Sequence, residues 1–204
     1  MGALAITGAS GNRGIVQRVG AEPEWLEVEV TTTAPNQTYT WNVFSGTNVS
    51  STTDWGDGTG ITTQADTGTR TKTYAAAGVY TVRIRASFGT GGGFNLSPSA
   101  DRTRLTGILS PIPAFTGLTN LAFFAWNCAG VTSLPDNLLR YAVSVTNLAY
   151  FLNGTSITSL PADLLRYVVN ATDLSFFLRS CTGLTSLPDD LLRYVVNVTN
   201  LSSF

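Results

Sequence analysis

Polar and apolar residues alternate in several short stretches of the first half of the chain. Leu26, Val28 and Val30 are separated by glutamates, and residues 39–43 and 79–84 follow the same pattern. A period of two places the apolar side chains on one face of a β-strand. Turn-forming residues separate these stretches and no long helical pattern lies between them, which predicts an antiparallel β-sandwich.

The second half repeats one pattern three times. Segments with the sequence Val/Ile/Leu-Thr-Ser-Leu-Pro begin at Val131, Ile157 and Leu184, with offsets of 26 and 27 residues. Each continues into Leu-Leu-Arg-Tyr and then Thr-Asn/Asp-Leu. A unit this short cannot bury its own apolar face, so it must stack on its neighbours. The pattern predicts a solenoid of about four units over residues 105–204, the first of them degenerate.

Within each unit, the segment after the proline predicts a short helix. Pro188 suits the first helical position, and the two aspartates that follow favour the positive end of the helix dipole. Four apolar residues then follow at helical spacing, namely Leu191, Leu192, Val195 and Val196. Together with a short strand at Thr-Ser-Leu, this predicts a C-terminal α/β solenoid of leucine-rich-repeat type.

The last unit lacks a polar capping segment. It stops at Phe204, within a segment that elsewhere runs on into another Leu-Thr-Ser-Leu. An apolar rung face would then be left open. We therefore expect the native protein to continue beyond Phe204, or another subunit to cover this end.

Two separated motifs stand out in the predicted sandwich. Thr53-Asp-Trp-Gly-Asp-Gly58 is followed by Lys72-Thr-Tyr-Ala-Ala-Ala-Gly-Val-Tyr-Thr-Val82. Together they resemble the polycystic-kidney-disease (PKD) domain, a β-sandwich of immunoglobulin type with a Gly-Asp-Gly turn and a later His-x-Tyr strand. Lys72 occupies the place of the family's histidine. The resemblance implies an immunoglobulin-like sandwich over residues 25–90, with a turn formed by Trp55, Gly56, Asp57 and Gly58.

The repeats carry a second resemblance. Thr-Asn-Leu-Ser-x-Phe alternates with Cys-Thr-Gly-Leu-Thr-Ser-Leu-Pro, a pattern similar to BspA-like leucine-rich repeats. A PKD-like domain that leads into such repeats is typical of bacterial surface proteins and tailed-phage structural proteins, so it implies adhesion or virion architecture. The expected organisation is a lead-in over residues 1–24, the sandwich over 25–90, a connector over 91–104 with a flexible glycine-rich start, and the repeats over 105–204.

The composition narrows the function classes. Charged residues are 12% of the chain and the net charge is −1, so the basic footprint expected of a nucleic-acid-binding protein is missing. No apolar run is long enough to span a bilayer. Histidine is absent, which removes the commonest general base and metal ligand. We therefore expect a non-enzymatic protein without a cofactor.

The start of the chain bears on localisation. Residues 1–8 lack a basic region and a long apolar core, so they do not form a secretory signal. A weakly charged surface rich in Thr, Asn and Gly is common in β-rich extracellular and virion proteins. A virion protein fits both observations, because particles assemble in the host cytoplasm and act outside it.

The two cysteines occupy related places in the repeat. Cys128 and Cys181 each lie three residues before a Val/Leu-Thr-Ser-Leu segment, and Gly154 holds the same place in the unit between them. With rungs about 4.8 Å apart, the cysteines would be separated by roughly 10 Å, which is too far for a disulfide. We expect two buried thiols.

A column of arginines and a column of tyrosines are predicted to run along the solenoid. Arginine beside aromatic rings can bind sugars or acidic groups. The candidate binding face consists of Arg140, Arg166, Arg193, Tyr141, Tyr167 and Tyr194. The alternative is a solvated edge in which the pairs Asp163–Arg166 and Asp190–Arg193 form at i, i+3. The repeat phenylalanines are expected in the core, namely Phe123, Phe124, Phe151, Phe176 and Phe177.

Two further patterns allow two interpretations each. Asp54 and Asp57 offer oxygen ligands for Ca²⁺, or Asp57 holds its own turn through backbone contacts. The glycines of the segment from Gly8 to Gly14 resemble the glycine-rich turn of short-chain dehydrogenases. However, Pro23 closes the only stretch that could form the crossover helix, and the chain then turns to a β pattern. This favours a flexible attachment segment over a dinucleotide site.

The sequence thus favours a structural or adhesive virion protein of a tailed phage, such as a fibre, an appendage or a head decoration. The N-terminal region would attach to other virion proteins, and the repeats would bind a host surface protein or glycan. Self-association is expected because virion appendages are usually symmetric. The alternatives are a bacterial cell-surface adhesin and, more remotely, a dinucleotide-binding enzyme.

Overall fold

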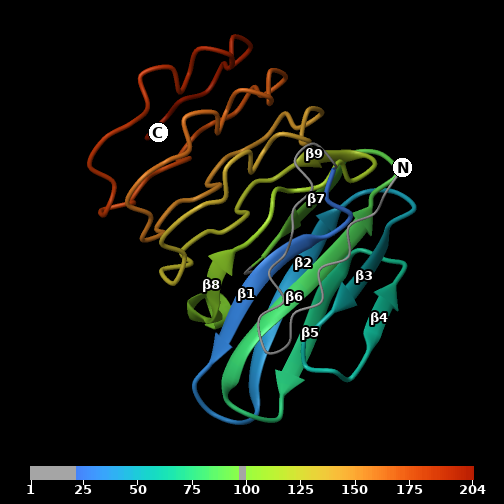
Figure 1. The fold of residues 1–204 in the computed structure, drawn as a ribbon. Helices are drawn as coiled ribbons and strands as arrows, with labels where there is room; N and C mark the ends of the chain where they lie inside the picture. Colours follow the sequence, from blue (N-terminus) through green and yellow to red (C-terminus); the bar gives the residue numbers. More distant parts are fainter. Residues whose placement is uncertain (1–21, 97–99) are drawn as a thin grey trace, which may run out of the picture.

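Two β-sheets form the N-terminal part of the protein (Figure 1). The computed structural model describes residues 22–96 and 100–204. A five-stranded sheet has the order β4-β3-β6-β1-β8. Its strands are β1 (Leu26–Thr32), β3 (Ser50–Asp54), β4 (Ile61–Gln64), β6 (Gly78–Ser87) and β8 (Leu105–Ile108). A four-stranded sheet has the order β5-β2-β7-β9, and its strands are β2 (Gln37–Ser45), β5 (Gly68–Tyr74), β7 (Gly92–Asn95) and β9 (Leu118–Asn120).

The alternating pattern explains why these strands pack as two layers. In β1, Leu26, Val28 and Val30 are fully buried, and the residues between them are only partly covered. β1 pairs antiparallel with β6 along its whole length. The strands predicted near residues 26–31, 39–43 and 79–84 are thus confirmed, and the two layers are compatible with the expected immunoglobulin-like sandwich.

Polar contacts cross the space between the two sheets. The Trp41 indole N–H of β2 donates to Thr53 Oγ1 of β3 at 3.2 Å. Arg70 of β5 is 1% exposed, and its Nε donates to Ser51 Oγ at 2.9 Å. Its guanidinium also lies 5.3 Å from the Trp41 ring centroid. Burial lowers the pKa of Arg70, with Asp66 opposing this shift, and hydrogen bonds to the backbone oxygens of Asp66 and Gly68 support the buried cation.

The four-stranded sheet continues into the repeats without a break. β7 pairs parallel with β9, and single parallel bridges then join Asn120 to Asn147, Asn147 to Asp173, and Asp173 to Asn200. Figure 1 shows the rungs stacked beyond β9, coloured from yellow to red towards the C-terminus. The sandwich therefore provides the first layer on which the solenoid is built.

The predicted α/β solenoid is wrong, because the repeats contain no α-helix. The helical segment within the described residues is one 3₁₀ helix, η1 (Ala100–Arg104), which precedes β8. After each repeat proline the backbone forms consecutive turns, in which the Leu164 N–H donates to Pro161 O and the Arg166 N–H to Asp163 O, at 3.1 and 3.0 Å. These are i→i−3 bonds, whereas an α-helix needs i→i−4 bonds. The repeats are coils held by turns and by their neighbours.

Two left-handed backbone positions recur along the solenoid, one in four rungs and the other in three. The first column consists of Phe123, Tyr150, Phe176 and Ser203, with φ between 53° and 61°. The second consists of Asn127, Gly154 and Ser180, with φ of 55°, 71° and 62°. Just before the first column, the side chain at each bridge position accepts the N–H two residues later, as in Asn147 Oδ1 with the Ala149 N–H at 2.9 Å. These turns bend each rung back onto the stack.

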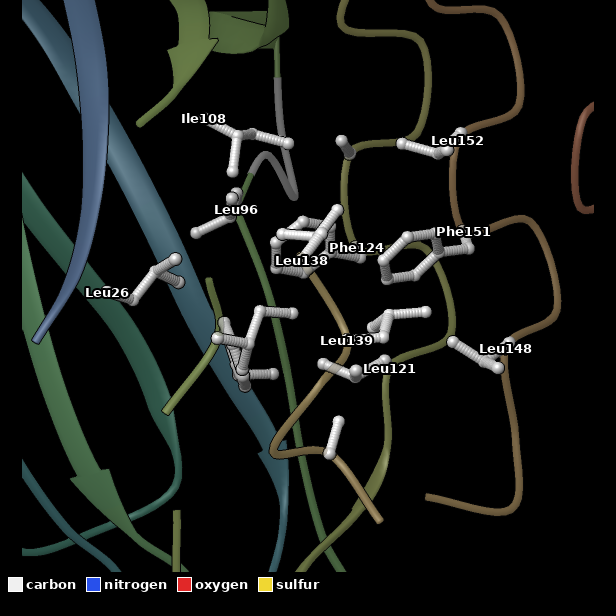
Figure 2. Packing of buried hydrophobic residues seen from close by; sticks show 14 of the residues in the cluster. Leu26, Leu96, Ile108, Leu121, Phe124, Leu138, Leu139, Leu148, Phe151 and Leu152 are labelled. Carbon is white, nitrogen blue, oxygen red and sulfur yellow. The ribbon is translucent and has the colours of Figure 1, made fainter. Parts of the chain in front are cut away.

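One hydrophobic core runs through the sandwich and the solenoid (Figure 2). Leu26 and Ile108 from the sandwich belong to the same cluster of buried side chains as Leu138 and Phe151 from the repeats. Along its axis, Phe124, Phe151, Phe177 and Phe204 stack with centroids 4.8, 5.4 and 5.7 Å apart. Because the sandwich and the solenoid share this core, packing in each part stabilises the other.

Strand β7 begins within the glycine-rich stretch that was predicted as a flexible break. A Cβ atom on Gly92 would lie 1.9 Å from Phe88 Cβ, and one on Gly93 would lie 2.5 Å from the Phe44 ring. These glycines are buried and allow β7 to approach its neighbours closely. Close packing therefore explains why glycine occurs at these positions. In the expected connector, Phe94 and Leu96 are fully buried core residues.

Cys128 and Cys181 are buried thiols, as expected. The residue between them in the stack is Thr155 and not Gly154, because the middle rung is one residue shorter in this loop. Thr155 Oγ1 lies 3.4 Å from Cys181 Sγ and donates to Leu152 O at 2.8 Å. Gly154 takes the left-handed position with Asn127 and Ser180.

Candidate functional site

The predicted arginine and tyrosine columns come together as one face of the solenoid, here called the Arg–Tyr face. The Arg140 guanidinium lies 5.8 Å from the ring centroids of both Tyr141 and Tyr167. Arg166 lies 5.9 Å from Tyr167 and 5.6 Å from Tyr194. Each of these two cations therefore contacts the tyrosine of its own rung and that of the next. The arrangement orders the arginines while their charged groups stay exposed.

Only one of the two expected ion pairs on this face is formed. Arg193 Nη1 lies 3.3 Å from Asp190 Oδ2, with both side chains more than half exposed, so the pair contributes little to stability. Arg166 forms no ion pair with Asp163 or with any other carboxylate of the described residues. Arg140 has none either, because Asn137 occupies the equivalent place. Two guanidinium groups on adjacent rungs thus keep N–H donors available to a ligand.

A valine lies two positions beyond each tyrosine of this face, and its exposed fraction differs from rung to rung. Val143, Val169 and Val196 are 51%, 43% and 81% exposed. The next residue ties rungs together in the later units, where the Asn170 and Asn197 side chains donate to Val143 O and Val169 O at 2.9 Å. The Arg–Tyr face therefore presents charged, aromatic and aliphatic groups that recur from rung to rung.

The residues of the predicted PKD-like turn gather at one end of the sandwich. Trp55 is 3% exposed, and its indole N–H donates to Thr62 Oγ1 at 2.9 Å. Gly56 has φ of 74°, and a Cβ atom there would lie 2.4 Å from Thr81 O. The Tyr74 hydroxyl donates to Trp55 O at 3.0 Å. Burial, with smaller effects from nearby Asp57, Tyr80 and Asp54, raises the pKa of this hydroxyl far above its ordinary value.

Asp57 is held by Thr59 in its own turn and by Lys72 of β5. Its Oδ1 accepts the Thr59 N–H and hydroxyl at 3.2 and 2.7 Å, and its Oδ2 lies 2.6 Å from Lys72 Nζ. Burial opposes ionisation of this carboxyl, but the hydrogen bonds from Lys72 and Thr59 outweigh it and lower its pKa. Gly58 completes the turn with φ of 76° in open space.

Asp54 also contacts protein groups. Its Oδ1 accepts the Gly56 N–H at 3.0 Å, and its Oδ2 lies 3.8 Å from Arg83 Nη1. Within residues 22–96 and 100–204, no three metal-ligating side chains gather into a site. The contacts of Asp54 and Asp57 correspond to the interpretation in which these carboxylates hold a turn. The segment from Gly8 to Gly14 lies outside the described residues.

A second, partly exposed array, here called the aromatic strip, was not predicted from the sequence. It consists of Phe123, Tyr150 and Phe176, whose rings stack with centroids 4.8 and 4.4 Å apart and planes within 12° of each other. Phe123 and Phe176 were expected in the core, but Phe123 is 36% exposed and Phe176 is half-buried. A signal was present: Tyr150 holds the same place in its rung as Phe123 and Phe176, and its polar hydroxyl indicates that this column faces outward.

Comparisons with protein-family models, curated proteins and solved structures gave no match. Among the described residues, no helix is long and apolar enough to cross a membrane.

Proposed function

We propose that this protein is a non-enzymatic structural and adhesive protein of a tailed-phage particle. The N-terminal region attaches it to other virion proteins, the sandwich acts as a spacer, and the solenoid binds a host surface protein or glycan through the Arg–Tyr face. Self-association in the particle belongs to the same proposal.

One observation carries this proposal more than any other. The bridge ladder from Asn120 to Asn200 and the shared core join the sandwich and the solenoid into one continuous unit. A continuous stack that repeats an arginine and a tyrosine at each rung is suited to hold a ligand away from its point of attachment.

The virion assignment is tested on purified particles. We expect peptides of this chain in the mass spectrum of particles purified from a lysed host culture, and gold-labelled antibodies at one defined position on them. Recovery of the chain in the outer-surface fraction of a bacterium, with none in particles, would replace the proposal with the cell-surface adhesin.

The binding role of the Arg–Tyr face needs a separate experiment. A triple variant with Arg140→Gln, Arg166→Gln and Arg193→Gln is expected to lower adsorption to host cells about tenfold while incorporation into particles stays unchanged. Arg85→Gln, which changes an exposed arginine of the sandwich, is the matched control and should adsorb normally. Normal adsorption of the triple variant would remove this face from the proposal.

A further inference from the structure

The two left-handed columns of the solenoid are built from opposite kinds of residue. Asn127, Gly154 and Ser180 are small residues of the kind that tolerate a positive φ. The aromatic strip occupies three of the four places in the other column, with φ of 61° at Phe123, 57° at Tyr150 and 57° at Phe176, and Ser203 takes the fourth. A bulky side chain with positive φ is an outlier whose conformation costs free energy. Aromatic residues thus occupy a backbone position at which glycine or asparagine would cause less strain.

Core packing does not account for these rings. The inner stack of Phe124, Phe151 and Phe177 is fully buried and fills the axis of the solenoid. The strip lies on the outer side of the same rungs, where each ring covers the face of its neighbour and leaves its edge to solvent. Aromatic edges carry the positive end of the ring quadrupole. The exposed surface of the strip therefore favours negative groups.

Cations border the strip. The Arg179 guanidinium lies 5.2 Å from the Phe176 centroid, and Arg102 lies 4.1 Å from the centroid of Trp126, which packs edge-on against Phe123. Arg179 is exposed and has no carboxylate within ion-pair distance among the described residues. The carboxylate of the adjoining bridge column, Asp173, accepts the Ser175 N–H at 2.8 Å and stays in its turn. Asp173 therefore forms no ion pair with Arg179, whose guanidinium stays available beside the strip.

We propose that the aromatic strip binds an extended anionic polysaccharide that lies along the solenoid, with its carboxylate groups towards Arg179 and the ring edges. The rung spacing favours a polysaccharide over an acidic peptide. Rungs recur at about 4.8 Å, whereas same-face side chains of an extended peptide recur at about 6.8 Å. A pyranose unit advances by about one rung. This site is separate from the Arg–Tyr face and does not depend on the virion assignment.

The test is calorimetric titration of the whole chain with an octamer of galacturonic acid, and with its fully methyl-esterified, uncharged form as the matched ligand. The acidic octamer is expected to bind at least tenfold more tightly than the ester. Tyr150→Gly and Arg179→Gln are each expected to weaken binding about tenfold. Glycine accepts the local φ without strain, so Tyr150→Gly reports the loss of the ring.

Three controls make the result decisive. Ser180→Gly, in the other left-handed column, and Arg85→Gln, in the sandwich, should bind as the unchanged chain does. The melting temperature of each variant separates lost binding from lost folding, and Arg179→Gln alone decides if Tyr150→Gly does not fold. Absence of binding to the acidic octamer, equal binding of the ester, or retained affinity in Arg179→Gln would overturn the proposal. Tighter binding of oligoglutamate with the same dependence on Arg179 would overturn it in favour of an acidic peptide.

Discussion

At the scale of single residues, buried polar groups in the sandwich fix the contacts between its sheets. Arg70 is the largest charged example, since its guanidinium packs on Trp41 and donates to Ser51 while its acidic neighbour Asp66 is 71% exposed. The five donors of an arginine can serve several acceptors at once, whereas lysine offers a single point charge. A lysine at this position would keep the positive charge but could not make the same set of contacts.

Asp57 leads to a prediction about pH. Its pKa is lowered in the folded protein from the ordinary value of 3.8, so its charged form contributes stability that is present above about pH 4 and is lost as the pH falls through the folded-state pKa. Asp57→Asn keeps an oxygen for the Thr59 N–H but removes the ion pair with Lys72. We expect it to lower the free energy of unfolding at pH 7 by about 1 kcal/mol or less.

Urea unfolding at pH 7 and at pH 3 measures this effect. The difference between Asp57→Asn and the unchanged chain should shrink at the lower pH, because the wild-type carboxyl is then increasingly protonated. Lys72→Met is the complementary variant and should show the same trend. A difference that stays constant between the two pH values would contradict the role given to the charge.

At the scale of elements, the β7 strand connects the sandwich to the solenoid. Gly92→Ala would place a methyl group against Phe88 and force β7 away from β9. We expect a loss of about 2–3 kcal/mol in the free energy of unfolding, as for other overpacked core positions. Gly91→Asn is the control, because Gly91 has φ of 64° with no atom near its Cβ position, and asparagine tolerates that conformation. Similar losses in the two variants, measured by urea unfolding, would count against the packing argument.

The same scale shows which elements the sequence could predict. The strict alternation around Val28 fits one structure, a half-buried strand, and β1 forms there. The apolar spacing of Leu164, Leu165 and Val168 fits two backbone conformations. A helix and a series of three-residue turns both bring these side chains to one side, and all three are buried in the structure. Burial was therefore predictable, but the backbone conformation was not.

Turns form in the repeats in place of helices for a physical reason. A helix shorter than three turns is marginal by itself, and each rung already obtains its backbone hydrogen bonds from its neighbours, as with the Leu148 N–H and Asp173 O at 2.9 Å. The left-handed aromatic column was also beyond sequence reasoning, since φ at Phe123 depends on the stack as a whole. By contrast, the Arg–Tyr column followed from the repeat offset alone.

At the scale of the whole molecule, the continuous core predicts that the sandwich and the solenoid unfold together. Differential scanning calorimetry should give one transition whose calorimetric and van't Hoff enthalpies agree. Two resolved transitions would mean that the β7–β9 pairing contributes little to cooperativity. Gly92→Ala offers an internal comparison, because its methyl group would disturb the β7–β9 connection and Phe88 beside it.

The ladder of single bridges also has a mechanical consequence. A rung adds about 4.8 Å to the folded length, but its 26 or 27 residues extend to about 90 Å once released. A pull applied at the rung of Asn200 would separate that rung first, when its bridge and its backbone hydrogen bonds to the neighbouring rung break together. The solenoid would then lengthen by successive release of rungs, so that a sudden pull is converted into extension and the peak force at both ends is lowered.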